Sequence, residues 1–295
     1  MNKIAIYNGF HFHYEVLGYL IEYFLYKNIN FDLYSTYNNS SSNWKQFYDR
    51  IFNKNIQWLI PNSFNSDNYN IVIIATGDDL SCICNNKIKI IRIEHGIDYQ
   101  LQYAHFRITT RYINNNYRWA LPIFNGLSKN DKKNILDKQK KINVLILGRN
   151  NPSSIKQLKD IFFNFKNLNL FIVSRSFGIE FEKESNTFIY ANCPTNLMLI
   201  LLELSHYVLC LDNSELYNSD CYAQYKISGS IPLSFSFGAR LILPKKWQDF
   251  YKFESVLTYD NGLNLDKDTN LDIIYSEKNN LINHRNNTFD NVLNN

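Results

Sequence analysis

The residues best suited to acid–base chemistry in the first half of the chain follow an apolar segment, 87–93, that is typical of a strand. They are Glu94, His95 and Asp98, with a glycine after the histidine. An imidazole can accept the proton of a hydroxyl group, and a neighbouring carboxylate can orient the ring and raise its basicity. We therefore predict His95 as a general base and Asp98 as its partner. The alternative is a structural histidine bonded to the backbone.

A competing candidate for the base follows the first apolar segment, 3–7. His11, His13 and Glu15 stand there at a spacing of two residues. Ligands of open α/β sheets sit at the carboxyl ends of the strands, which is where these side chains would lie. His13 could therefore be the base, and the alternative is a pair of solvated loop histidines. The cluster offers fewer ligands than a zinc site needs, so no metal is expected.

In the second half, two apolar segments, 142–147 and 168–173, are each followed by an arginine. A guanidinium at the carboxyl edge of a sheet can pair with a phosphate through two parallel hydrogen bonds. A single arginine in such a place is usually only solvated, but two on successive strands of one sheet indicate an anion site. The candidate residues here are Arg149, Asn150, Arg175 and Ser176.

A turn of small residues, Ser228, Gly229 and Ser230, precedes an apolar segment, 231–237, that contains Pro232 and is followed by Gly238. Proline suits the first turn of a helix, and glycine commonly ends one. The pattern predicts a helix whose first N–H groups lie in the Ser-Gly-Ser turn, where they could bind phosphate. The alternative is a buried helix that binds nothing.

These residues need a scaffold in which strand ends meet at one edge, and the chain alternates apolar strand patterns with helical ones throughout. The pattern predicts an α/β protein with two Rossmann-like, doubly wound parallel sheets and a cleft between the two domains. We expect an N-terminal domain over residues 1–125, a Lys-rich, solvated linker over 126–141 and a C-terminal domain over 142–295.

Composition excludes several classes of protein. With 295 residues the chain is long enough for two cores, and its net charge of +4 is too small and too scattered for a nucleic-acid surface. No segment approaches the length of a membrane span, and the first residues resemble a strand rather than a signal peptide. The five cysteines are scattered. A cytoplasmic protein with free thiols is expected, and the oligomeric state is left open.

The run from Gly229-x-x-Pro232 through Gly238 to Pro244 resembles the nucleotide-sugar half of glycosyltransferases with the GT-B architecture. The resemblance implies that the Gly/Ser turn contacts the diphosphate of the donor and that Arg149 contacts phosphate. It also implies that the loop at 191–195, with Asn192 and Pro194, faces the base of the nucleotide.

Two further features bear on this resemblance. Some inverting members of the family have a His-Gly pair after a strand as their general base, which His95 resembles. Many retaining members have a glutamate early in the helix that follows the Gly/Ser turn, whereas residues 231–237 contain no acidic residue. That departure puts a retaining mechanism of that type in doubt.

Together these features predict a metal-independent glycosyltransferase of the hexosyltransferase type, without a cofactor. The donor would be a UDP- or GDP-sugar, and the acceptor a hydroxyl group of a glycan or a protein. Two alternatives remain: a sugar-nucleotide epimerase of the same architecture, and a non-catalytic protein that binds a glycan or a partner on this fold.

Overall fold

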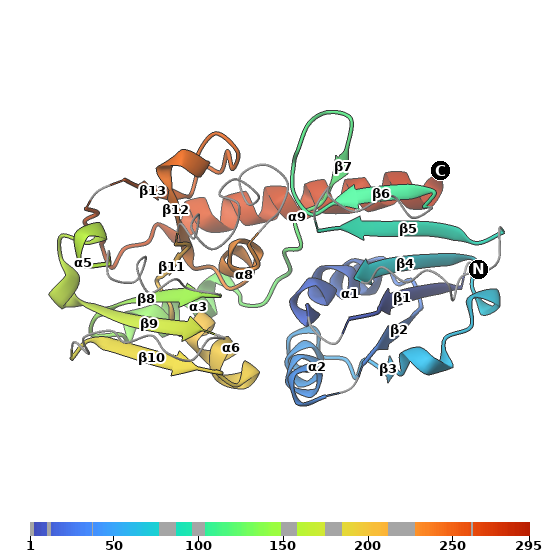
Figure 1. The fold of residues 1–295 in the computed structure, drawn as a ribbon, viewed down its shortest axis with the longest axis horizontal. Coiled ribbons are helices and arrows are strands. Elements are labelled where there is room, and N and C mark those ends of the chain that lie inside the picture. The colour runs from blue at the N-terminus through green and yellow to red at the C-terminus, as the bar shows by residue number, and fades with distance from the viewer. Residues whose placement is uncertain are drawn as a thin grey trace. The chain divides into compact units, whose positions relative to one another are not determined.

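The computed structural model describes residues 3–10, 13–36, 38–76, 87–95, 104–148, 158–174, 185–211, 228–260 and 262–295. These residues form two compact units, each built on its own parallel sheet (Figure 1). Unit 1 contains the described residues up to Phe124 together with Leu281–Asn295, and unit 2 contains those from Asn125 to Asn280. The predicted α/β class with two Rossmann-like sheets is confirmed.

Unit 1 is organised around a parallel sheet with the order β3-β2-β1-β4-β5-β6-β7. The central strands, β1 and β4, are almost fully buried, as expected for strands with helices on both faces. The order reverses direction between β1 and β4, which makes this the switch point of a doubly wound sheet. The strands are β1 (Ile4–Asn8), β2 (Phe31–Ser35), β3 (Trp58–Leu59), β4 (Ile71–Thr76), β5 (Lys89–Glu94), β6 (Phe106–Thr109) and β7 (Arg118–Trp119).

Three strands of unit 1 are shorter than the sequence predicts. The residue patterns of segments 56–60, 107–113 and 118–123 predict strands over their whole length, but these segments contain only β3, the end of β6, and β7. At the end of β6 the hydroxyl of Thr109 donates to the carbonyl of Arg111 at 2.7 Å and to that of Arg118 at 3.1 Å. The first contact lies within the turn directly after β6, and the second joins Thr109 to Arg118 of β7, the strand with which β6 pairs.

The helices of unit 1 are η1 (Tyr14–Val16), α1 (Leu17–Tyr26), α2 (Asn39–Phe52), η2 (Pro61–Ser63), η3 (Ser66–Asn68) and the second half of α9 (Leu271–Asn294). The polar run 40–43 has the composition of a loop, and a loop was predicted there, but the run belongs to α2. Asn38 accepts a bond from the N–H of Ser41 at 2.9 Å, and its own N–H donates to the Ser41 hydroxyl at 2.7 Å. This capping box makes the serine run the first turn of the helix.

Unit 2 contains a second parallel sheet with the order β10-β9-β8-β11-β12-β13, so its switch point lies between β8 and β11. Its strands are β8 (Ile142–Leu147), β9 (Leu168–Ser174), β10 (Thr187–Ala191), β11 (Tyr207–Leu209), β12 (Arg240–Pro244) and β13 (Leu257–Tyr259). Its helices are α3 (Lys129–Asp137), α5 (Leu158–Ile161), η4 (Phe165–Asn167), α6 (Thr195–Leu204), α8 (Ser230–Ser236), η5 (Lys245–Trp247) and the first part of α9.

The sequence signals around α8 are confirmed. Pro232 lies in the first turn of the helix, and Gly238 has a left-handed backbone with φ of 65°. The N–H of Gly238 donates to Phe235 at 3.1 Å and the N–H of Ala239 to Ser234 at 2.9 Å, which is a Schellman motif. The helix therefore ends where the sequence predicts and leads directly into β12.

Two other predictions for unit 2 need correction. The helix expected over residues 153–165 ends at Ile161, because the backbone of Leu263 bonds on both sides of Phe162; residues 153–157 lie outside the described part. The Lys-rich segment is not simply a solvated linker, because its helix α3 contains Lys132, whose side chain is fully buried.

The C-terminal segment forms a single long helix, α9, and its second half belongs to unit 1. Arg285 anchors that half, since its buried guanidinium donates to Glu22 at 2.7 Å and to the carbonyl of Ile123 at 2.8 Å. Over the described residues, none of the helices has the length and apolar character needed to span a membrane.

Candidate functional site

The carboxyl edge of sheet A is locked together by side chains at the ends of three strands. The buried Asn8, the last residue of β1, donates to the hydroxyl of Ser35 on β2 at 3.0 Å and accepts from the hydroxyl of Thr76 on β4. The N–H of Gly9 also donates to the carbonyl of Thr76, at 2.9 Å. These bonds hold the first residues of the loop after β1 in place at the switch point of the sheet.

His13 lies on this loop, where its backbone is left-handed with φ of 62°. Its Nδ1 lies 3.0 Å from Oε1 of Glu15, which can only accept at neutral pH, so Nδ1–H donates, and in the neutral form of the ring the lone pair is on Nε2. The buried Tyr48 of α2 donates to the carbonyl of Tyr14 at 2.8 Å and holds the turn in place. About 42% of the His13 side chain is exposed.

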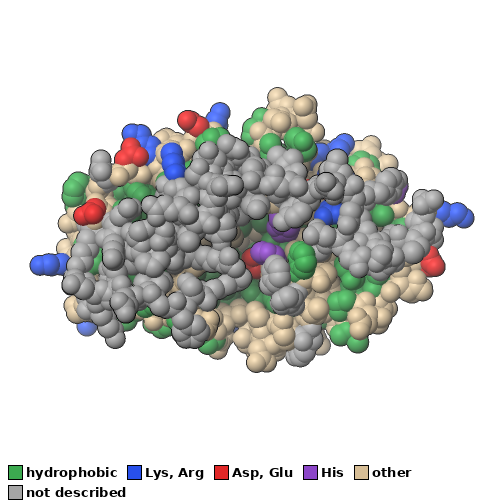
Figure 2. Space-filling view, in the orientation of Figure 1, with side chains coloured by type: hydrophobic (Ala, Val, Ile, Leu, Met, Phe, Trp, Pro, Cys, Tyr) green, Lys and Arg blue, Asp and Glu red, His purple; other side chains and the backbone are tan. Residues whose placement is uncertain are grey.

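His95 lies beside His13, although 81 residues of sequence separate the two loops. Their rings stack with centroids 5.6 Å apart and an interplanar angle of 21°. The Nε2–H of His95 donates to the carbonyl of Ala75 at 2.9 Å, which places its lone pair on Nδ1. The structure thus brings together the two histidines that the sequence treats as rivals. Histidine side chains reach the surface next to an acidic group in Figure 2.

The protonation of these groups follows from their surroundings. Burial alone would raise the pKa of the Glu15 carboxyl, but the hydrogen bond and charge of His13 outweigh it, so the pKa lies below its ordinary value. Burial lowers the pKa of His95, and its bond to Ala75 opposes this only in part. At neutral pH Glu15 is therefore an ionised carboxylate bonded to His13, and His95, stacked on the His13 ring, is a neutral imidazole.

Of the two other carboxylates predicted near His95, the described structure contains only Glu94. Glu94 forms ion pairs with Arg92 and Arg107, at 3.8 and 3.7 Å. Asp98 lies outside the described residues, so its predicted role is untested. Glu15 is the residue that sequence reasoning undervalued, and its signal was the His-x-Glu spacing after β1.

In unit 2 the Ser228–Ser230 turn lies at the switch point of sheet B. The hydroxyl of Ser230 donates to the carbonyl of Leu147, the last residue of β8, at 3.3 Å. The hydroxyls of Ser228 and Ser230 also bond to the thiol of Cys210, which directly follows β11. Burial raises the pKa of this thiol to about 12. The turn therefore contacts the ends of both strands at which the order reverses.

The remaining predicted donor-binding residues follow neighbouring strand ends. Gly148, with φ of 112°, donates from its N–H to Val173 of β9 at 3.2 Å, so the chain leaves β8 beside the end of β9. Asn192, also left-handed, donates to Ser174 at 3.0 Å, and Pro194 caps α6. The other four predicted residues, Arg149, Asn150, Arg175 and Ser176, lie outside the described residues.

Metal ligands do not gather in the described part of the chain: it contains no group of three or more His, Cys, Asp or Glu side chains placed to hold an ion. The described candidate groups are thus an imidazole pair with a carboxylate in unit 1 and, considered separately, a serine-rich turn at the switch point of the sheet in unit 2.

Comparison with known proteins identifies the fold. No protein-family model and no curated protein matches this sequence. The chain is similar in structure to AviGT4, a glycosyltransferase involved in avilamycin A biosynthesis, with a TM-score of 0.60 and 10% identity over 99% of this chain and 96% of that one. It is also similar to HepE of Anabaena in complex with UDP-glucose, with a TM-score of 0.54 and 10% identity over 98% and 95%.

A third similar structure is the UDP-GlcNAc 2-epimerase of Neisseria meningitidis bound to UDP-GlcNAc, with a TM-score of 0.53 and 11% identity over the whole of both chains. At such low identity these likenesses show the fold alone. The chain has the GT-B fold, as its resemblance to GT-B glycosyltransferases implied.

Proposed function

We propose that this protein is a glycosyltransferase that moves a sugar from a UDP-sugar to the hydroxyl group of a glycan or protein acceptor. The observation that carries the proposal is the His13–Glu15 hydrogen bond of 3.0 Å at the switch point of sheet A, on a fold shared with sugar-nucleotide enzymes. We propose UDP rather than GDP as the nucleotide of the donor because similar structures hold UDP-glucose and UDP-GlcNAc.

His13 is the proposed general base. Its Nε2 takes the proton of the acceptor hydroxyl as the oxygen forms a bond to the anomeric carbon and the bond from that carbon to the diphosphate breaks. Glu15 holds the ring by its Nδ1–H and stabilises the imidazolium that forms. His95, stacked on the same ring, is the competing base and otherwise supports the orientation of His13.

Unit 2 is the proposed donor side and unit 1 the acceptor side. The Ser228–Ser230 turn and the loop that leaves β8 would hold the diphosphate and stabilise its charge as it departs. We assign Arg149, Asn150, Arg175 and Ser176 to the same anion and Asn192 and Pro194 to the nucleotide base. The reaction is proposed to need no metal ion, so activity should persist in EDTA.

Product analysis tests the proposal. The purified protein is incubated with UDP-glucose, UDP-galactose and UDP-GlcNAc, with and without a panel of glycan and peptide acceptors. We expect a glycosylated acceptor and free UDP, and a loss of about 10²–10⁴-fold in rate for His13→Gln. An epimerised UDP-sugar formed without an acceptor would indicate an epimerase instead. UDP-sugar binding without any product would indicate a non-catalytic binder.

A further inference from the structure

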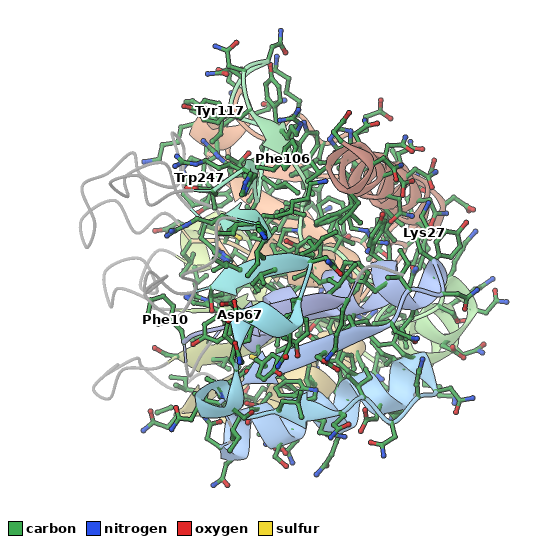
Figure 3. The ribbon with its side chains drawn as sticks, turned by 90° about the vertical axis from the view of Figure 1, so that its right-hand side faces the viewer. Phe10, Lys27, Asp67, Phe106, Tyr117 and Trp247 are labelled. Carbon is green, nitrogen blue, oxygen red and sulfur yellow. The ribbon has the colours of Figure 1, made fainter. Side chains whose placement is uncertain are left out.

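A hollow of about 250 Å³ opens on unit 1 between the connection that joins β6 to β7 and the second half of α9. It involves none of the residues assigned above. In Figure 3, Tyr117 of this connection lies at the top of the view, apart from Phe10, whose loop precedes His13. The lining residues are Tyr112, Asn114, Asn115, Tyr117, Arg118, Trp119, His284, Thr288 and Asn291.

The wall of the hollow is a loop fixed by its own hydrogen bonds. The side chain of Asn114 accepts from the N–H of Asn116 at 2.9 Å, and its carbonyl accepts from the N–H of Tyr117 at 3.2 Å. Two tyrosines project from this turn, Tyr112 with 47% and Tyr117 with 38% of its surface exposed. A loop held in this way presents aromatic rings to solvent at little further cost in ordering.

The floor of the hollow comes from Trp119 and α9. The carbonyl of Trp119 accepts from Nε2–H of His284 and from the hydroxyl of Thr288, each at 3.1 Å. The Trp119 and His284 rings lie with centroids 4.1 Å apart. The loop and the helix are thereby joined into one surface, with indole, imidazole and phenol rings side by side.

The charge of the hollow is low. Burial lowers the pKa of His284, and its bond to Trp119 opposes this only in part, so the ring is neutral at pH 7. Arg118 is the cation of the lining, and its guanidinium lies over the ring of Phe106 at 5.3 Å. Neither Asp nor Glu contributes to the described lining. Without a carboxylate the described lining does not suit a metal ion, and its side chains other than Arg118 are neutral groups suited to a neutral ligand.

The polar groups of the lining match vicinal hydroxyls. The side-chain amides of Asn114, Asn115 and Asn291 each have a nitrogen that donates and an oxygen that accepts, as a hydroxyl group does both. The amide oxygens of Asn114 and Asn115 already accept one bond each, from Asn116 N–H at 2.9 Å and from the Tyr112 hydroxyl at 3.1 Å, and each has a second lone pair. An aromatic ring has a negative face, which attracts the C–H face of a pyranose. The volume is smaller than the roughly 300 Å³ and more of drug-sized sites, and it fits one sugar ring better than a whole nucleotide sugar.

We propose that this hollow binds a single neutral pyranose residue of a glycan through the tyrosines of the β6–β7 connection and the asparagines around them. The loop begins at the carboxyl edge of the sheet that also carries His95, because the N–H of Thr110 donates to the carbonyl of Glu94 at 3.0 Å. If this glycan is the acceptor of the transferase, that part of the inference rests on the proposed function. The binding of a pyranose in the hollow does not depend on the proposed function.

Binding of methyl glycosides to the full chain tests the inference. Methyl glycosides of glucose, galactose, mannose and N-acetylglucosamine, with uridine for comparison, are titrated by ligand-observed NMR. We expect millimolar binding of at least one glycoside, weakened about tenfold or more by Tyr117→Ala, as for the loss of an aromatic anchor. Asn291→Ala, an exposed helical position, should also weaken it without harm to the fold.

The matched control is Tyr26→Ala, which removes a tyrosine that is 71% exposed on α1 and should leave glycoside affinity unchanged. The inference is overturned if no glycoside binds, if both lining variants bind as tightly as the parent, or if only uridine binds in a Tyr117-dependent way. UDP-sugar binding and transfer are measured on the same parent protein. Their failure alone counts against the proposed function, whereas loss of glycoside binding alone counts against the hollow.

Discussion

At the scale of single residues, the arrangement of His13 depends on an unusual backbone conformation. A left-handed conformation is uncommon for a residue other than glycine, although histidine adopts it more readily than most. Here the Tyr48 hydroxyl holds the following turn through the carbonyl of Tyr14, and Glu15 holds the ring. The conformation brings the imidazole and the carboxylate together within three residues of sequence.

The Glu15→Gln variant tests whether this carboxylate serves the base. Loss of the charge destabilises the imidazolium, so kcat should fall by on the order of 10²-fold or more. Because the pKa of Glu15 lies below its ordinary value, the carboxylate is ionised at neutral pH, and Glu15→Asp, which keeps the charge, should retain more of the rate than Glu15→Gln. A kcat for Glu15→Gln equal to that of the parent would exclude the role.

Sequence reasoning predicted the kinds of residue in this site but not their neighbours. His13 and His95 were each predicted from a strand end, because a strand followed by polar residues is a local signal. Their stacking depends on the positions of β1, β4 and β5 in the sheet and on the bond from His95 to Ala75. Such contacts are long-range, and no local pattern encodes them.

At the scale of elements, Lys132 of α3 joins its helix to the C-terminal end of α6. Its ammonium donates to the carbonyls of Leu202, Glu203 and Ser205 at 3.2, 2.9 and 2.6 Å. These groups are carbonyls that a helix end leaves without intrahelical partners. A segment that the sequence suggested was solvated therefore contains a buried connection within unit 2.

This connection should make stability depend on pH. Burial lowers the pKa of Lys132 from 10.5 to about 7, with Glu203 opposing and Lys278 reinforcing the shift. Between these values the unfolded chain binds more protons than the folded one, so stability should rise with pH from about 7. Relative to Lys132→Met, the unfolding free energy of the parent should rise by roughly 1 kcal/mol per pH unit at most.

Urea unfolding of the parent and Lys132→Met at several values between pH 7 and 9 measures this difference. Lys133→Met, an exposed position on the same helix, is the control and should follow the parent. A parent-minus-variant difference that stays flat over this range would show that Lys132 keeps its proton in the folded state.

Elements with strong local signals were predicted well. The end of α8 follows from Gly238, because a left-handed residue is needed for the Schellman motif. The start of α2 was missed because Asn38 stands in a run of Asn and Ser residues, any of which can cap a helix. The short strands β3 and β7 were overestimated, since their length depends on pairing rather than on composition.

At the scale of the whole molecule, the fold class was predictable because strands buried on both faces of a parallel sheet are nearly continuous apolar runs. The order of the strands in the two sheets was not predicted, because it depends on pairing between segments far apart in the sequence. In sheet B this order puts the start of α8 against the last residue of β8. The predicted Arg149 and Arg175 follow β8 and β9 in the sequence and lie outside the described residues.

The central claim is that unit 2 binds the diphosphate of a UDP-sugar at the switch point of its sheet. A crystal structure of the full chain with UDP tests it most directly. We expect the diphosphate within hydrogen-bond distance of the Ser228–Ser230 turn, beside the carboxyl end of β8. Well-defined UDP bound away from that turn, or no UDP at saturating concentration, would contradict the account.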